Sequence, residues 1–111
     1  MDSPLHRVRS TAFFIAALLV VLVLIGPSTA FAADVFKGRE IYLSRCQSCH
    51  GAGGEGVMAG TPNFARGESL FQTDQELIDG IRRGKGMMPG FGGMLSDDDI
   101  ANVVAYIRTF L

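Results

Sequence analysis

The sequence predicts a small all-α domain that follows an N-terminal export segment. Three observations support this fold class. Helix-capping residues stand at Thr73 and Ser96, each followed three positions later by an acidic residue. An apolar stripe with the helical period of 3.6 residues runs from Ile100 to Leu111. No segment alternates between apolar and polar residues as a half-buried strand would.

The N-terminal residues 1–32 have the pattern of a signal peptide. A basic start is followed by an unbroken apolar run over residues 11–25, a Gly-Pro helix breaker and a small-residue cleavage pattern that ends at Ala32. We therefore expect a single domain over residues 33–111 that is exported to the periplasm. The alternative is an uncleaved membrane anchor, because residues 11–33 carry no charge and are long enough to span a bilayer.

Three helices and two glycine-rich loops are expected in order along the domain. The first helix covers residues 34–45. Its candidate N-cap is Asp34, and its apolar positions are Phe36, Ile41, Tyr42 and Leu43. The second helix covers residues 73–83 and opens with a capping box, and the third follows Ser96 and carries the apolar stripe. The two loops cover residues 51–60, with a continuation to Phe64, and residues 84–93.

The composition of the domain excludes several classes of protein. Residues 33–111 carry 8 basic and 10 acidic side chains, so no basic face is available for nucleic acid. A domain this short buries a thin core and usually needs a staple or a bound group for stability. The chain has only two cysteines, too few for a disulfide framework. We therefore expect a monomer with a bound group at its centre.

Residues 46–50 read Cys-Gln-Ser-Cys-His, which is the C-x-x-C-H attachment signature of c-type haem. Two thiols three positions apart can reach the two vinyl groups of one porphyrin. The histidine that follows then lies beneath the iron as its proximal ligand. The sequence thus predicts one covalent haem c, held by Cys46 and Cys49 and ligated by His50.

Two other interpretations of the cysteine pair are weaker. A thioredoxin-like redox disulfide would accompany a βαβ pattern, which the sequence lacks. A zinc site needs four ligands, whereas residues 33–111 contain two cysteines and one histidine. The second histidine of the chain, His6, lies in the export segment, so cleavage would exclude bis-histidine ligation.

The favoured sixth ligand of the iron is Met88. Because it precedes Pro89, its backbone is pushed into an extended conformation, which places the side chain on a stiff loop. In an extended segment the neighbouring Met87 points the other way, Met94 is expected to pack near the last helix, and Met58 lies too close to the proximal loop. The alternatives left open are Met87, another residue such as Lys85, and an open coordination position.

Several stretches of the domain resemble class I cytochromes c, in particular the short bacterial and photosynthetic electron carriers. They are Gly38-x-x-x-Tyr42, Cys46-Gln-Ser-Cys-His50-Gly51, Gly60-Thr-Pro62-Asn-Phe64, Gly84-Lys-Gly-Met-Met88-Pro89-Gly-Phe91 and Tyr106-Ile107. The resemblance implies a small cytochrome c fold, with three to four helices and glycine-rich loops around one haem.

The resemblance also implies roles for particular residues. Gly38 and Tyr42 would cross the last helix at Val103 and Tyr106, and the carbonyl of Pro62 would accept a hydrogen bond from Nδ1 of His50. Partners for the haem propionates stay open among Arg66, Arg82, Tyr42 and Asn63. The basic residues Arg82, Arg83 and Lys85 either steer an acidic partner or complement a helix dipole. The dipole also explains the acidic residues 97–99.

The function that follows is electron transfer rather than catalysis. Iron with histidine and methionine as axial ligands has no position for a substrate, and methionine raises the reduction potential. The partners would be redox proteins, met in the periplasm or, for a photosynthetic relative, the thylakoid lumen. One alternative is a fixed electron-transfer subunit of a periplasmic dehydrogenase or oxidase complex. A weaker one is a haem enzyme or sensor with an open iron site.

Overall fold

The computed structural model describes residues 13–20 and 32–111 of the chain. These residues belong to two compact units, Met1–Phe31 and Ala32–Leu111. In the first unit, residues 13–20 are helical. Most of the predicted export segment, including nearly all of its cleavage pattern, lies outside the described residues. No helix in the described part of the chain is long and apolar enough to cross a bilayer.

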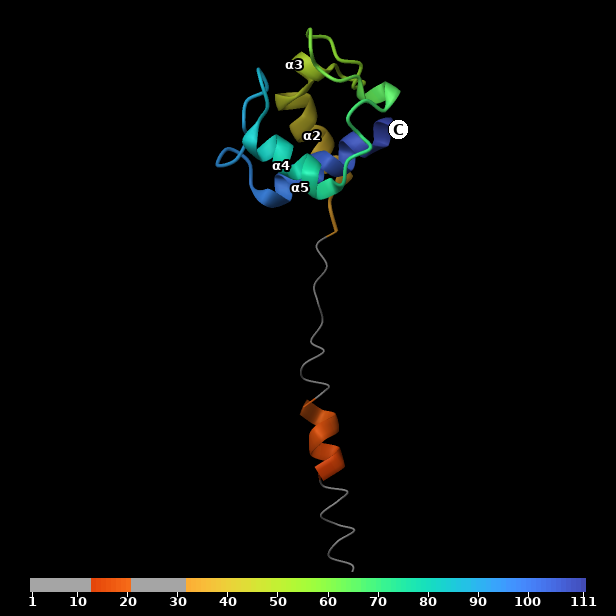
Figure 1. Ribbon diagram of the computed structural model, residues 1–111, viewed down its shortest axis with the longest axis vertical. Coiled ribbons are helices and arrows are strands. Elements are labelled where there is room, and N and C mark those ends of the chain that lie inside the picture. Colours follow the sequence, from red (N-terminus) through yellow and green to blue (C-terminus); the bar gives the residue numbers. More distant parts are fainter. Residues whose placement is uncertain (1–12, 21–31) are drawn as a thin grey trace, which may run out of the picture. The chain divides into compact units, whose positions relative to one another are not determined.

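The second unit is helical, as the sequence predicts (Figure 1). Its helices are α2 (Val35–Arg45), α3 (Gln47–His50), α4 (Asp74–Arg83) and α5 (Asp97–Ile107), with two 3-10 turns, η1 (Phe64–Arg66) and η2 (Arg108–Phe110). Within residues 32–111 the only β-type pairings are two isolated bridges, Lys85 with Met88 and Gly92 with Leu95. The sequence did not predict α3, and the last helix gives way to η2 before Leu111.

All three predicted N-caps are confirmed. The Asp34 carboxylate accepts hydrogen bonds from the backbone N–H groups of residues 36 and 37. Thr73 and Glu76 form the reciprocal capping box, with the Glu76 carboxylate 2.8 Å from the Thr73 nitrogen. The Ser96 hydroxyl accepts from the Asp99 nitrogen at 3.1 Å. These side chains satisfy orphan N–H groups at each helix start, which fixes where the helices begin.

The close crossing of α2 and α5 forms the frame of the domain. A Cβ atom at Gly38 would lie 1.9 Å from the carbonyl oxygen of Asn102, so only glycine allows this approach. Next to the crossing, the ring of Tyr42 meets the ring of Tyr106 edge-on at a centroid distance of 5.3 Å. The Asn102 side chain accepts a hydrogen bond from the Asp34 nitrogen at 2.7 Å. The crossing implied by the resemblance is therefore present.

The core lies between α2, α4, α5 and the loop before α4. Its buried hydrophobic residues are Tyr42, Phe64, Leu70, Leu77, Val103, Val104 and Ile107. Phe36 departs from the prediction, because 83% of it is exposed although it was expected among the apolar positions of the first helix. It stands in the first turn of α2, outside the crossing with α5 that buries Gly38 and Tyr42.

Arg108 connects the C-terminal turn to the segment that precedes α4. Its guanidinium forms an ion pair with Asp74 at 2.7 Å and donates to the carbonyl oxygens of Leu70 and Gln72. Three groups separated from Arg108 by more than thirty residues in sequence are thus held by one side chain. No pattern in the sequence predicts this contact.

Candidate haem site

The C-x-x-C-H residues form one tight turn at the end of α2. Cys46 is both the C-cap of α2 and the N-cap of α3, and α3 consists of the next four residues. The carbonyl oxygen of Cys46 accepts hydrogen bonds from the backbone nitrogens of Cys49 and His50 at 3.2 and 3.0 Å. Gly51 ends the turn with a φ of 81°, which a residue with a side chain rarely adopts. The turn places the three predicted haem-binding residues on one short helical segment.

His50 is buried against an aromatic ring. Only 8% of the residue is exposed, and its ring stacks on that of Phe64 with a centroid distance of 4.8 Å and an interplanar angle of 9°. Burial lowers the pKa of the imidazole, because desolvation disfavours the charged form. The neutral imidazole is the form that binds a metal ion. The structure therefore favours the ligating state of His50.

The two cysteines are half-buried and are not joined to each other by a disulfide. Burial, together with the proximity of Cys49, raises the pKa of the Cys46 thiol to about 11. Catalytic redox cysteines instead need a lowered pKa, because the thiolate is the reactive form. The environment of Cys46 therefore argues against the redox-disulfide alternative and is compatible with attachment of a porphyrin.

The loop after α3 folds back onto the carbonyl groups of the motif. The carbonyl oxygen of Cys49 accepts hydrogen bonds from Val57, Met58 and Thr61, and that of His50 accepts from the Gly56 nitrogen at 2.7 Å. Behind the turn, the hydroxyl of Tyr42 donates to the carbonyl oxygen of Gly51 at 2.7 Å, within the protein interior. These bonds fix the position of the proximal histidine through the main chain on both sides of it.

The hydrogen bond from His50 to Pro62 is absent from the structure. Nδ1 of His50 is buried and has no hydrogen-bond partner among the residues that the structure describes. The Pro62 carbonyl oxygen instead lies beside Gly56, where a Cβ atom at residue 56 would approach it to 3.1 Å. The imidazole plane is set by its stack on Phe64, which sequence reasoning did not foresee. The role that the resemblance implies for Pro62 therefore stays a prediction.

Among the four methionines of residues 32–111, Met88 is the most buried. It is half-buried, whereas Met87, Met94 and Met58 have exposed fractions of 86%, 58% and 41%. The expectation that Met94 packs near the last helix is wrong, because its side chain faces solvent. The exposure pattern favours Met88 among the candidate sixth ligands.

The segment that carries Met88, residues 84–96, is called the methionine loop below. Its first part is a turn in which Lys85 and Met88 exchange backbone hydrogen bonds at 3.1 and 3.0 Å. After Pro89 the chain returns along the end of α4, where the nitrogens of Phe91 and Gly92 donate to the carbonyl oxygens of Ile81 and Arg82. A Cβ atom at Gly84 would lie 2.5 Å from the Met88 oxygen, so glycine is required for this path.

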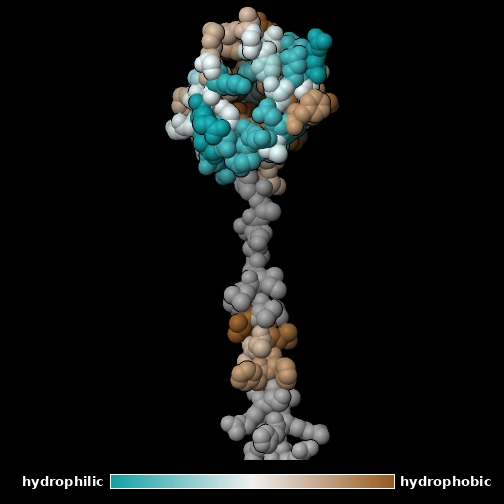
Figure 2. All heavy atoms as spheres, viewed as in Figure 1, coloured by the Kyte–Doolittle hydropathy of each residue, from teal (hydrophilic) through white to brown (hydrophobic). Residues whose placement is uncertain are grey.

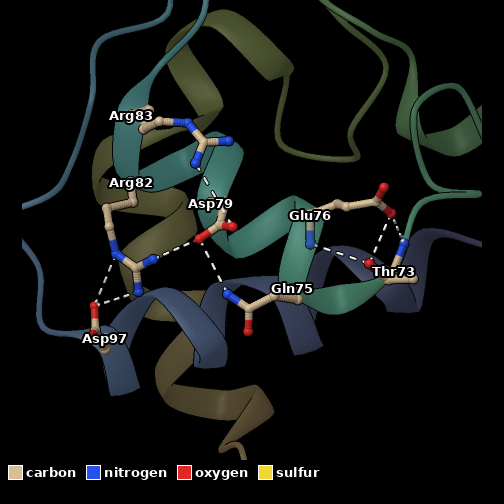
Figure 3. A network of polar contacts seen from close by, with 7 residues as sticks. All are labelled: Thr73, Gln75, Glu76, Asp79, Arg82, Arg83 and Asp97. Carbon is tan, nitrogen blue, oxygen red and sulfur yellow. Dashed lines mark hydrogen bonds and ion pairs between the residues drawn. The ribbon is translucent and has the colours of Figure 1, made fainter.

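Two of the basic residues before the methionine loop are engaged in ion pairs. Arg82 contacts Asp79 and Asp97, and Arg83 contacts Asp79 at 3.8 Å (Figure 3). Their charges are thus partly neutralised, which weakens the interpretation as a steering patch for acidic partners. Asp97 and Asp99 likewise form ion pairs, with Arg82 and Lys37, in addition to their favourable place at the start of α5.

The four candidate partners for the haem propionates differ in how many hydrogen bonds and ion pairs they already make within the protein. The Tyr42 hydroxyl is bonded to Gly51, and Arg82 is held by two aspartates. Asn63 caps η1 by accepting from the Arg66 nitrogen. The guanidinium of Arg66 is exposed and makes no ion pair within the described part of the chain, so it is the least committed of the four.

The second unit is hollowed on one face. Figure 2 shows a hollow in this face of the unit, with hydrophobic surface inside it and hydrophilic residues below it. In the same view the methionine loop and the loop after α3 stand on opposite sides of the unit, with α3 between them (Figure 1). Cys46, Cys49 and His50 with its neutral imidazole provide the donor set that covalent haem needs. The residues present therefore fit this cofactor.

Comparison with known proteins gives the same assignment. The family described as "Cytochrome C oxidase, cbb3-type, subunit III" matches residues 33–107. A cytochrome c6 of Synechococcus sp. is 39% identical over 102 residues, which are 87% of this chain and 89% of that protein. The cbb3-type cytochrome c oxidase subunit FixP of Azorhizobium caulinodans is 39% identical over 83 residues, which are 66% of this chain and only 28% of that protein.

A solved structure of cytochrome c6 from the diatom Phaeodactylum tricornutum is similar in fold as well as in sequence. Its TM-score is 0.58 and its identity is 35%, over 69% of this chain and 93% of that one. The predicted small cytochrome c fold is thereby confirmed, as is the assignment of a single covalent c-type haem. The chain belongs to the cytochrome c family, as a class I monohaem member similar to the cytochromes c6.

Proposed function

We propose that this protein is an exported carrier of single electrons, with His50 and Met88 as the axial ligands of its haem iron. The observation that carries the proposal is the placement of these two side chains. His50 is buried and neutral on the turn that holds both cysteines, and Met88 is the one methionine of the domain shielded on a constrained loop. Bound haem supplies the reversible one-electron couple of its iron.

The two proposed ligand residues would prevent a substrate from binding to the haem iron. The turn of α3 holds the backbone of His50 in place, and the Lys85–Met88 turn holds the backbone of the methionine. With His50 and Met88 both bound to the iron, no position would be left for a substrate, so the protein would act as a carrier and not as an enzyme. Because neither ligand has to move, electron transfer would require little rearrangement.

The partners would be redox proteins that meet the domain briefly. Small residues surround the haem-binding turn, among them the exposed Ala52 and Gly53, and the methionine loop contributes Gly90 and Gly92. A partner surface could come close to the cofactor over such residues. Redox encounters of this kind are small and short-lived. Export would place them in the periplasm, or in a thylakoid lumen, as suits a relative of cytochrome c6.

The experiment that tests the proposal begins with the protein produced in a host that matures c-type haem. Intact-mass spectrometry should give the polypeptide plus one haem, and the same spectrum reports whether the N-terminus lies after Ala32. A mass equal to the amino acids alone would refute the cofactor assignment for this chain.

The ligand assignment is tested by matched methionine variants. Met88→Ala should lower the reduction potential and abolish the absorption band that marks a thioether on ferric haem. Met87→Ala, in the adjacent exposed residue, and Met94→Ala should leave both unchanged. Retention of the band in Met88→Ala would show that another group ligates the iron.

The second candidate function is a fixed electron-transfer subunit of an oxidase or dehydrogenase complex. It is favoured by the family match and by the similarity to FixP, of which this chain covers 28%. A fixed subunit would remain with a membrane complex during purification at high salt. A carrier would leave as a free protein under the same conditions.

A further inference from the structure

One side chain connects the two ends of the methionine loop. Arg82 lies in the last turn of α4, directly before the loop, and Asp97 is the first residue of α5, directly after it. The guanidinium of Arg82 donates to Oδ1 of Asp97 from Nε at 3.2 Å and from its terminal nitrogen at 2.8 Å. The ion pair therefore closes the loop at its base.

The guanidinium is also fixed from the α4 side. Its other terminal nitrogen donates to Oδ1 of Asp79 at 2.7 Å, and Gln75 donates to the same oxygen at 3.2 Å. Figure 3 shows the guanidinium between the two aspartates, with Asp79 on α4 and Asp97 on α5. Arg82 is thus held in one orientation while it reaches across to the next helix.

Arg82 touches the loop between these ends as well. Its carbonyl oxygen accepts a hydrogen bond from the Gly92 nitrogen at 3.0 Å. Its Cγ atom lies so close to Gly92 that an added Cβ would approach it to 2.9 Å. The segment that returns from Met88 is therefore confined between the stem of Arg82 and the end of α4.

We infer that Arg82, braced by Asp79 and paired with Asp97, is a positioning residue that holds the methionine loop closed and so keeps the Met88 sulfur on the haem iron. This inference rests on the proposed function. It adds that the strength of methionine ligation is set by a surface ion-pair network. Breaking the network should make it easier for an added ligand to displace the methionine.

The chain offers a matched control for each partner. Arg83 is adjacent on the same helix, carries the same charge and is 72% exposed, but it makes no contact with Asp97. Asp98 is adjacent to Asp97 at the same helix start, and it forms no ion pair within the described residues. Substitution of Arg83 or Asp98 therefore removes a charge at the same helix end but leaves the Arg82–Asp97 ion pair intact.

The experiment measures the affinity of the ferric holoprotein for imidazole, which competes with methionine for the iron. Arg82→Gln and Asp97→Asn should each raise this affinity by about two- to fivefold, the range expected for one exposed ion pair. Arg83→Gln and Asp98→Asn should leave it unchanged, and the double variant of Arg82 and Asp97 should resemble either single variant. The difference should shrink at high salt, because salt screens exposed charges.

A second readout does not depend on the sixth ligand. Amide hydrogen exchange of the holoprotein should be faster across residues 85–95 in Arg82→Gln but not in Arg83→Gln. Equal imidazole affinity and equal exchange in these two variants would overturn the inference. Absence of the thioether band in the unmodified protein would instead refute the assignment of Met88, and hydrogen exchange would still decide whether Arg82 holds the loop.

Discussion

The two segments that would supply axial ligands are held in different ways. The segment around His50 is fixed by main-chain hydrogen bonds to the carbonyl oxygens of residues 49 and 50 and by the buried ring of Phe64. The methionine loop is fixed at its base, by the end of α4 and by the ion pair of the half-buried Arg82 with the exposed Asp97, while its tip faces solvent.

This difference indicates which ligand the fold protects. Main-chain hydrogen bonds between uncharged groups respond little to salt or to single surface substitutions. Surface ion pairs respond to both. Added salt or a surface substitution should therefore loosen the methionine loop first. The His50 segment should lose its structure only when the core of the domain unfolds.

The largest effect is expected from Gly38→Ala, which disrupts the close crossing of α2 and α5 that supports the His50 segment. The added methyl group would lie 1.9 Å from the Asn102 carbonyl oxygen, so α2 and α5 would have to separate. We expect a loss of about 4 kcal/mol or more in the free energy of unfolding of the holoprotein, or failure to accumulate. Chemical denaturation measures this, and a midpoint unchanged from that of the native protein would contradict the close crossing.

Phe64→Ala tests the histidine side directly. It removes a buried ring that stacks on His50 and on Phe110, and it should cost about 3 kcal/mol of unfolding free energy. The matched control is Phe71→Ala, in the same connecting segment, where the ring is 91% exposed. The control should change stability by less than about 0.5 kcal/mol. Similar losses in the two variants would mean that Phe64 does not form the stack.

The features that sequence predicted correctly are those encoded by neighbouring residues. The caps at Asp34, Thr73 and Ser96 depend on bonds to residues two or three positions away, so their patterns can be read locally. The haem motif is equally local, and its spacing of thiols and imidazole led to the cofactor that the family assignment supports. The preference for Met88 over Met87 came from one neighbour, Pro89, and agrees with the observed burial.

The features that sequence did not predict depend on residues far apart in the chain. Arg82 donates a hydrogen bond to Asp97, which lies fifteen positions away in sequence, and Arg108 donates one to Leu70, thirty-eight positions away. No periodic pattern signals such contacts. The prediction for Phe36 was wrong for a related reason. An apolar residue in a helix is buried only if another element covers the face on which it lies. The role of Pro62 was taken from resemblance alone, and it stays a prediction.

A smaller effect is expected from Tyr42→Phe, which removes one buried hydrogen bond behind the histidine turn. The Gly51 carbonyl oxygen would lose its donor, at a cost of about 1 kcal/mol in unfolding free energy. Tyr106→Phe is the control, since the Tyr106 hydroxyl makes no hydrogen bond within the described residues. Denaturation of both variants measures the difference. A stable Tyr42→Phe protein would show that the main-chain bonds alone hold the turn.

The smallest effect concerns α4, which supports the methionine loop, and it depends on pH. Hydrogen bonds from the backbone and hydroxyl of Thr73 hold the pKa of Glu76 below its ordinary value of 4.5. A lowered folded-state pKa means that the charged carboxylate stabilises the fold above the unfolded-state pKa, and that this contribution is lost as the pH falls through the folded-state value. Glu76→Gln should thus be less stable than the native protein near neutral pH, and the two should converge in acid. The control is Glu40→Gln, which removes an exposed carboxylate without a hydrogen bond in the described part of the chain and should leave the stability near neutral pH unchanged. Glu76 stands in the first turn of α4, whereas the methionine loop begins after the last turn. Fraying of α4 in Glu76→Gln should therefore leave the imidazole affinity at the native value. This result would separate the stability of the helix from the closure of the loop.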